Sequence, residues 1–242
     1  MIRKTLKTTK EATFVVTVPD KNRHNFPAPN GTGFFVSGKG YFITANHVVD
    51  KLNIGDVTDL ERPTDSFLVL VKNAKVINKW PNFDLALLKA ELEENKQRDY
   101  FKTRDNFPYL EIDFSNQEEG SPVYFFGYPL MKSSVRDTGN MLIGVTQIPS
   151  RVTSAIISST TEHFGPIRTS SDQKIYVLDK APNYGNSGGP VILSETGKVI
   201  SACIRFQPQY MKSSDTMVPS LYGITSSLQN IQNELQQLLK NT

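Results

Sequence analysis

Gly185-Asn186-Ser187-Gly188-Gly189-Pro190 is the stretch around which the rest of this chain can be organised. A serine hydroxyl is a weak nucleophile at neutral pH, so it needs a base to remove its proton and donors to stabilise the oxyanion. Glycine has no Cβ, so the backbone can fold tightly and bring the amides of Gly185 and Ser187 together. The stretch predicts a nucleophilic serine with a two-amide oxyanion hole, and an ordinary polar turn is the alternative.

The order of residues along the chain separates two arrangements for such a serine. The same stretch satisfies the G-x-S-x-G elbow of α/β-hydrolases, which place their acid and their histidine after the serine. The three histidines, His24, His47 and His163, all precede Ser187, which excludes the elbow. A base upstream of the serine fits the order His, Asp, Ser, in which histidine accepts the hydroxyl proton and a carboxylate orients it.

His47 and Asp84 are the candidates for the base and the carboxylate. His47 follows an apolar strand-like run, and Asp84 directly precedes the apolar run 85–88. Aspartate is disfavoured in strands and is rarely buried without a partner. We therefore expect Asp84 to be a buried carboxylate that pairs with His47.

Other motifs carry less weight. Gly33 and Gly38-Lys39 have the spacing of a phosphate-binding loop, but Gly40 replaces the required Ser or Thr, so we expect a turn between strands. Neither His24 nor His163 has metal-ligand spacing, and we expect no metal and no cofactor. The single cysteine, Cys203, lies in an apolar run and is expected to act as a small hydrophobic residue rather than a catalytic thiol.

Composition describes an ordinary globular protein. The 242 residues carry a formal net charge of +3 with scattered basic residues, so we expect no nucleic-acid partner. No stretch approaches membrane-spanning length, and the first apolar run, residues 14–18, is too short for a signal peptide. We expect a protein that does not bind membranes and is cytoplasmic, or alternatively a secreted one whose signal peptide has been removed.

Short apolar runs separated by turn signals predict an all-β chain. The strands are expected at residues 12–18, 34–37, 41–45, 84–89, 121–126, 142–146, 152–158, 174–178, 191–193, 198–206 and 221–224, with a strand hairpin at residues 66–79. Residues 90–107 are charged and aperiodic, which predicts a solvated connector. Apolar residues at helical spacing after Ser226 or Ser227 predict an amphipathic helix, Leu228 to Lys240, packed on the second half.

Three blocks, Thr44–Val49, Asp84–Leu87 and Gly185–Pro190, resemble in this order the signature blocks of chymotrypsin-fold (trypsin-like) serine peptidases. The match spans roughly residues 31 to 240. The resemblance implies two antiparallel six-stranded β-barrels with a C-terminal α-helix. It makes His47 the general base, Asp84 its orienting carboxylate and Ser187 the nucleophile. It also assigns the oxyanion hole to the amides of Gly185 and Ser187.

The resemblance also implies a division of the chain. Residues 1–107 form the barrel that carries His47 and Asp84, with the connector, and residues 108–242 form the barrel that carries Ser187, with the terminal helix. Asn186 stands where digestive members have an Asp that binds a new N-terminus, so activation by that ion pair is not expected. The sequence is closer to the HtrA-type and glutamyl-endopeptidase branches, and a single-domain bacterial protease is the expectation.

Specificity is inferred from pocket positions of the family. Ala181 stands where members that cleave after basic residues have Asp, and Cys203 stands where glutamyl endopeptidases place a His. The resemblance implies a small apolar pocket lined by Ala181, Pro182, Cys203 and Phe206. We expect small or medium apolar side chains at P1, the residue before the scissile bond.

The predicted function is a serine endopeptidase that cleaves proteins or peptides through an acyl-enzyme on Ser187. The alternative is a latent or inactive protease-fold binding module that a regulatory protein partner switches on, because the absence of the Asp leaves the oxyanion loop free to be ordered by a partner. An esterase is a weaker option.

Overall fold

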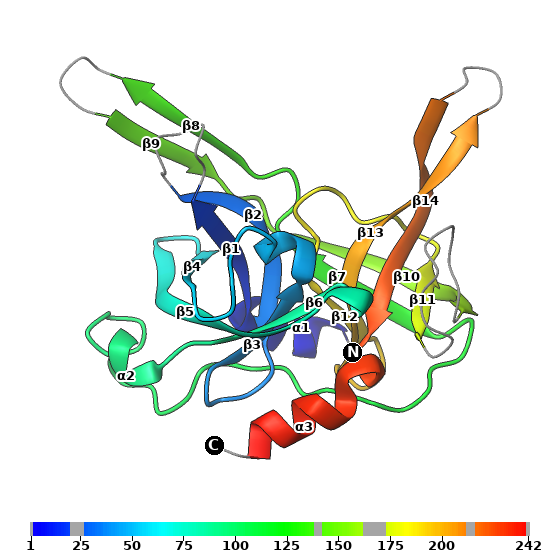
Figure 1. Ribbon diagram of the computed structural model, residues 1–242, viewed down its shortest axis with the longest axis horizontal. Helices are drawn as coiled ribbons and strands as arrows, with labels where there is room; N and C mark the ends of the chain where they lie inside the picture. Colours follow the sequence, from blue (N-terminus) through cyan, green and yellow to red (C-terminus); the bar gives the residue numbers. More distant parts are fainter. Residues whose placement is uncertain (1, 20–26, 138–141, 162–172, 212–215, 241–242) are drawn as a thin grey trace.

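The computed structural model describes residues 2–19, 27–137, 142–161, 173–211 and 216–240, and its strands form two closed barrels side by side (Figure 1). The first barrel has the order β1-β2-β3-β6-β5-β4 and the second the order β10-β11-β14-β13-β12-β7, all antiparallel. The predicted fold of two six-stranded barrels is confirmed. Closure gives every strand of either barrel a neighbour on both sides over at least part of its length.

The first barrel consists of β1 (Thr13–Pro19), β2 (Pro27–Phe35), β3 (Tyr41–Ala45), β4 (Val57–Pro63), β5 (Leu68–Trp80) and β6 (Leu85–Lys89). The second consists of β7 (Pro122–Gly127), β10 (Arg151–Thr161), β11 (Ile175–Leu178), β12 (Pro190–Leu193), β13 (Val199–Met211) and β14 (Thr216–Ser227). A separate ladder of β8 (Lys132–Asp137) and β9 (Leu142–Gln147) projects from the body of the molecule.

β1 is mostly apolar because both of its faces are buried from Thr13 to Val18. Phe14 and Val16 point into the core of the first barrel, whereas Val15 packs with Phe126 and Tyr128 of the second half. A strand that is covered on both sides reads as a continuous apolar run rather than an alternation. The turn at residues 38–40 joins β2 to β3, with Val36 N–H donating to the Tyr41 carbonyl at 2.8 Å, as expected for a hairpin.

The C-terminal helix contacts both barrels, so its predicted position on the second half holds only for its first turn, where Asn230 Nδ2 donates to the Lys174 carbonyl at 2.9 Å. It begins with a 3₁₀ turn, η4 (Leu228–Ile231), capped by Ser227, and continues as α3 (Gln232–Lys240). Trp80 Nε1 of β5 donates to Glu234 Oε2 at 2.7 Å. Leu228, Ile231 and Leu235 share a core with the first barrel.

The connector is not a solvated segment, contrary to expectation. Phe101 and Phe107 are buried, and the Phe107 ring stacks on Phe35 at 4.6 Å. In α2 (Leu92–Asn95), the buried Asn95 side chain accepts from the Lys72 amide at 2.9 Å. The segment follows irregular turns, so its buried residues have no constant spacing that a periodicity argument detects.

Helix α1 (Ile2–Ala12) precedes β1 and was not predicted. The hydroxyls of Thr5 and Thr9 lie 2.9 and 3.1 Å from the hydroxyl of Tyr124 on β7. The helix therefore contacts the second barrel before the chain enters the first. Its contacts are made partly by threonines, which carry little apolar signal.

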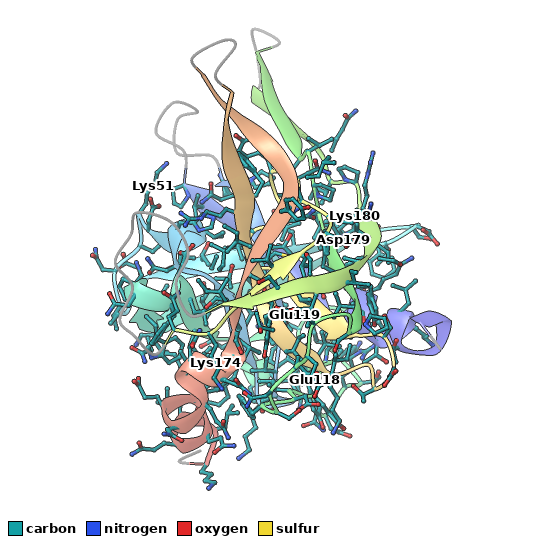
Figure 2. The ribbon with its side chains drawn as sticks, turned by 90° about the vertical axis from the view of Figure 1, so that its right-hand side faces the viewer. Lys51, Glu118, Glu119, Lys174, Asp179 and Lys180 are labelled. Carbon is teal, nitrogen blue, oxygen red and sulfur yellow. The ribbon has the colours of Figure 1, made fainter. Side chains whose placement is uncertain are left out.

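The outer face of the second barrel mixes acidic and basic side chains (Figure 2). Two of its carboxylates hold amides of β10: Asp179 Oδ1 accepts from Ile156 N–H at 2.9 Å, and Glu119 Oε1 accepts from Thr160 N–H at 3.1 Å. These two carboxylates therefore satisfy backbone N–H groups of β10.

Leu87 of β6 is fully buried in the core of the first barrel. Leu87→Ala should lower the free energy of unfolding by about 2–5 kcal/mol, because it removes apolar contacts and leaves a cavity. Urea denaturation followed by tryptophan fluorescence measures this. Ile54→Ala, at a side chain that is 64% exposed, is the control and should change the value by less than about 0.5 kcal/mol. Equal effects of the two changes would contradict this description of the core.

Candidate active site

The pairing of β3 with β6 brings His47 and Asp84 together. Ala45 at the end of β3 lies opposite Leu85 at the start of β6, so the residues just beyond each meet. His47 lies in a 3₁₀ turn, η2 (Asn46–Val49), directly after β3. Asp84 has a left-handed backbone (φ 51°), a conformation that Asp tolerates better than most residues.

Both carboxylate oxygens of Asp84 bind His47. Oδ2 lies 2.7 Å from the ring Nδ1, and Oδ1 accepts from the His47 backbone N–H at 2.9 Å. A carboxylate on Nδ1 keeps the proton there and leaves Nε2 as the acceptor. The Asp84 side chain is 27% exposed, so it is less buried than expected, and the His47 side chain is 45% exposed.

The turn that carries Ser187 is held by β2 of the first barrel. Thr32 N–H donates to the Ser187 carbonyl at 2.8 Å, and Thr32 Oγ1 donates to the Gly185 carbonyl at 2.6 Å. Gly188 (φ 82°) packs so closely that a Cβ would lie 2.2 Å from the Thr32 carbonyl oxygen. The glycine is therefore required by the contact between the barrels.

Two backbone amides of this turn are unpaired. The Tyr184 carbonyl accepts from Leu130 N–H at 2.8 Å, so the N–H of Gly185 in the same trans peptide points away from Leu130. Within the part of the chain that the structure describes, neither the Gly185 amide nor the Ser187 amide donates a hydrogen bond. Both residues line the same cavity. This is the arrangement that an oxyanion hole needs.

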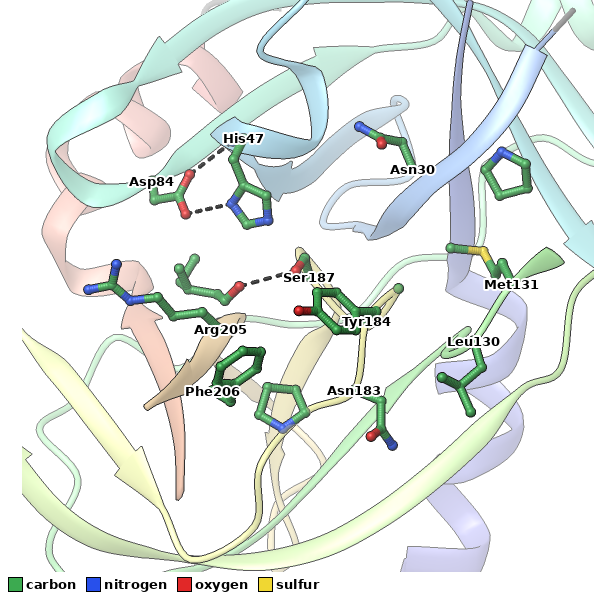
Figure 3. A pocket seen from close by; sticks show the side chains of 14 residues that line it. Asn30, His47, Asp84, Leu130, Met131, Asn183, Tyr184, Ser187, Arg205 and Phe206 are labelled. Carbon is green, nitrogen blue, oxygen red and sulfur yellow. Dashed lines mark hydrogen bonds and ion pairs between the residues drawn. The ribbon is translucent and has the colours of Figure 1, made fainter. Parts of the chain in front are cut away.

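The Ser187 hydroxyl points away from His47 in this structure. Its Oγ donates to the Ile204 carbonyl at 3.1 Å (Figure 3). The ring of His47 lies above Ser187 in the same view, with Asp84 on its far side. Moving the hydroxyl off the Ile204 carbonyl would break one hydrogen bond, a net cost of about 1 kcal/mol.

A cavity of about 560 Å³ surrounds these groups. Its lining comes from both barrels and comprises Pro29, Asn30, His47, Asp84, Leu130, Met131, Pro182, Asn183, Tyr184, Gly185, Ser187, Ile204, Arg205 and Phe206. The predicted catalytic and oxyanion residues therefore all line this one cavity, although 140 positions of sequence separate His47 from Ser187.

Comparison with known proteins agrees with this geometry. Residues 31–201 match the family model described as a trypsin-like peptidase domain. The chain belongs to the trypsin-like peptidase family. The matched model is that of a peptidase, so the predicted enzyme class of a trypsin-like protease is confirmed at that level.

Curated relatives of the peptidase are named as probable periplasmic DegP-like serine endoproteases. The protein of Bartonella henselae is 31% identical over 175 residues, covering 72% of this chain and 27% of the relative. That of Rickettsia conorii is 32% identical over 169 residues, covering 67% and 26%. The chain thus spans about a quarter of the length of these relatives.

Solved structures share the fold of the peptidase. The HtrA-type protease AlgW with a tripeptide superposes with a TM-score of 0.65 at 18% identity, covering 100% of this chain and 64% of that one. The protease domain of MamO from Magnetospirillum magneticum gives 0.61 at 19% identity, covering 95% and 98%. At these identities the likeness shows the chymotrypsin-like fold alone.

The pocket predicted for the peptidase is only partly assembled. Pro182 and Phe206 line the cavity, but Ala181 does not, and the side chain of Cys203 is fully buried in the core of the second barrel. Cys203 is therefore corrected from a pocket residue to a core residue. Burial raises the pKa of its thiol well above the usual range, which keeps it protonated and unreactive.

Several lining residues escaped the sequence analysis. Ile204 and Arg205 directly precede Phe206, which the sequence did single out, and this adjacency was the available signal. Met131 and Tyr184 lie outside the strands and Asn30 lies in the Pro- and Gly-containing part of β2 that was expected to be a loop, so no pattern indicated that these side chains converge.

No group of three metal-ligating side chains occurs among the residues that the structure covers. His24 and His163 lie outside the described residues. No helix within the described ranges is both long and apolar enough to cross a membrane.

Gly185→Ala tests the oxyanion turn. Gly185 has φ 96°, and a Cβ would lie 2.4 Å from the Tyr128 carbonyl oxygen, so the turn must shift and its amide must move. Loss of one oxyanion donor typically lowers turnover by about 10²–10³. We expect labelling of Ser187 by a fluorophosphonate to slow by a factor in this range, measured by mass spectrometry.

Gly55→Ala is the matched control for Gly185→Ala. Gly55 also has a positive φ (100°), but a Cβ there would meet nothing within 4 Å. This variant carries the same kind of backbone strain without touching the site, and its labelling rate should stay that of the wild type. Unaltered labelling of Gly185→Ala would contradict the assigned oxyanion hole.

Proposed function

We propose that this trypsin-like peptidase is a serine endopeptidase that hydrolyses proteins or peptides through an acyl-enzyme on Ser187. The observation that supports it most is that Asp84 binds both the backbone N–H and the ring Nδ1 of His47. Ser187 and the amides of Gly185 and Ser187 line the same cavity as His47. A metal or cofactor is not needed for this chemistry.

In the proposed mechanism His47 Nε2 takes the proton of the Ser187 hydroxyl as Oγ attacks the scissile carbonyl carbon. The amides of Gly185 and Ser187 stabilise the oxyanion. Protonated His47 then gives its proton to the leaving amine, and the acyl-enzyme forms. A water activated by His47 hydrolyses the ester and restores the serine. Asp84 holds the ring and stabilises the imidazolium throughout.

The outer edge of β13 supports an extended peptide as the substrate. β12 pairs with β13 only as far as Ala202 and Cys203 is bonded to Gly188 and Gly189, which leaves an edge from Ile204 onward that faces the cavity. A peptide can add to such an edge as a strand, through backbone hydrogen bonds. A substrate N–H that binds the Ile204 carbonyl would displace the Ser187 hydroxyl and let it turn toward His47. The peptide would thus complete the catalytic arrangement.

The same hydrogen bond is what favours the latent alternative. With Ser187 bound to Ile204, the resting site lacks the contact between nucleophile and base. A regulatory protein partner that reorients the serine would switch the enzyme on, and a module that never reorients it would only bind. An active peptidase and the latent alternative differ in whether Ser187 reacts in the absence of a partner protein.

We propose small or medium apolar residues at P1. The rings of Pro182 and Phe206 line the cavity near Ser187, and the Tyr184 ring lies 5.9 Å from that of Phe206 in an edge-on arrangement. These walls are apolar, which favours apolar side chains over charged ones.

A location outside the cytoplasm is proposed in place of the cytoplasmic expectation, which the comparisons do not support. Every curated relative found carries a name that calls it periplasmic. The earlier alternative of a secreted protein agrees with these names.

Labelling by a fluorophosphonate, read by intact-protein mass spectrometry, tests the proposed triad. We expect one adduct on wild type and none on Ser187→Ala, with a greatly slowed reaction in His47→Ala. Asp84→Asn should slow the reaction by roughly 10³–10⁴, because the imidazole loses its orientation and its tautomer. Asp179→Asn, a carboxylate on the outer face of the second barrel, is the control and should react at the wild-type rate. Wild-type protein that stays unlabelled until a partner is added would favour the latent form.

Cleavage of a randomised peptide mixture, with products sequenced by mass spectrometry, tests P1. We expect cuts after Ala, Val and Leu, and Phe206→Ala should extend them to larger apolar residues because it removes one wall of the pocket. A dominant preference for Arg, Lys or Glu at P1 would overturn this assignment.

A further inference from the structure

A second cavity of about 240 Å³ lies next to the first, on the Asp84 side of the site. The first barrel contributes residues 81–84 to its wall, and the second contributes Gln173, Arg205 and residues 224–226. Asp84, Ile204 and Arg205 border both cavities. A peptide that lies along β13 and reaches Ser187 therefore also passes this second cavity.

The second cavity is bordered by a cation that has no hydrogen-bond or ion-pair partner. Among the described residues that line it, the ionisable ones are Asp84 and Arg205. Asp84 is occupied on both oxygens by His47. Arg205 is exposed and makes no hydrogen bond or ion pair with any residue that the structure describes. A guanidinium whose N–H donors are all free at the rim of a cleft can bind an anionic group.

Gln173 adds a second, independent sign of a ligand. Its side chain is 6% exposed, yet its Oε1 has no hydrogen-bond partner. Buried polar atoms are normally paired, and those that are not call for an explanation. A side-chain amide can turn by half a rotation to present its NH₂ group instead of its oxygen. Gln173 can therefore donate to a ligand that enters this cavity.

We propose that this second cavity binds an acidic side chain of the substrate, with its carboxylate between Arg205 and the amide of Gln173. Arginine matches a carboxylate with two parallel N–H donors, which gives a strong and directional contact. The inference rests on the proposed function, because it takes the peptide substrate for granted.

The alternation of a strand places the acidic residue relative to the scissile bond. Arg205 and Phe206 are consecutive in β13, so their side chains point to opposite faces. Figure 3 shows the Arg205 guanidinium turned toward Asp84 and away from the Phe206 ring. A substrate strand beside them alternates in the same way. With P1 against Phe206, the acidic side chain is that of P2 or P4, the second or fourth residue before the scissile bond.

The test uses quenched fluorescent peptides with Leu at P1 that carry Glu or Gln at P2 or at P4. Glu and Gln have nearly the same shape, so the ratio of their kcat/KM values measures the contribution of the charge. For wild type we expect a Glu-to-Gln ratio of roughly 10 at one of the two positions. In Arg205→Gln the ratio should fall to about 1, and Arg205→Glu should prefer Lys at that position.

Two further variants control for net charge and for the amide. Lys51→Gln removes an exposed cation outside both cavities and should keep the wild-type ratio. Gln173→Leu leaves Arg205 in place but removes the second donor, so its ratio should lie between that of wild type and that of Arg205→Gln.

Binding of the same peptides to Ser187→Ala, followed by fluorescence anisotropy, separates this inference from catalysis. Cleavage and binding that are equal for Glu and Gln at both positions would overturn the acidic site and leave the peptidase intact. Peptides that bind with an Arg205-dependent preference for Glu, but that wild type never cleaves, would support the site and overturn the proposed turnover. A preference for Gln over Glu would also overturn the acidic site.

Discussion

Thr32 is the residue through which the two barrels are placed relative to each other. It is fully buried in β2 of the first barrel, and all of its polar atoms are used. Its N–H and hydroxyl donate to the carbonyls of Ser187 and Gly185, its carbonyl accepts from Thr44 Oγ1, and its hydroxyl accepts from the Tyr128 amide. Because a buried polar network is costly to leave partly unsatisfied, this set of bonds restricts the turn that carries Ser187 to one position beside β3. That position faces the His47 turn, which follows β3.

Strand β13 combines several roles on one short edge. The Cys203 carbonyl holds the Gly188 amide at 2.7 Å, and the Ile204 carbonyl holds the Ser187 hydroxyl at 3.1 Å. Arg205 and Phe206 then face different compartments of the cleft. A peptide that pairs with this edge would compete for the acceptor of Ser187 and at the same time place its side chains in the two cavities. Substrate recognition and alignment of the nucleophile would then depend on the same backbone groups.

The first barrel is covered by segments that come from elsewhere in the chain. The connector packs Phe101 and Phe107 onto it, and the C-terminal helix reaches it through the bond from Trp80 to Glu234 and through apolar residues of η4 and α3. The amphipathic pattern of that helix indicates that one face is buried, but it carries no information about which barrel buries it. The contact depends on where β14 ends in space.

The sequence by itself determined most of the strands, the two-barrel fold and the residue types of the candidate site, although β4 and β8 were not predicted and the hairpin expected at residues 66–79 is the single strand β5. Short β-branched runs between turn residues are local features, and the His, Asp and Ser blocks can be read in order without knowing any distance. Only the tertiary structure decided which side chains enter the cavity. Cys203 lies opposite Thr225 and Arg205 lies opposite Ile224, so Ile204 is an extra residue at a bulge in β13. A bulge breaks the period-two alternation and re-aims the residues that follow it. Counting positions along the sequence therefore predicted that Cys203 lines the pocket. In the structure, the register of β13 with β14 places Cys203 in the core and Arg205 at the surface.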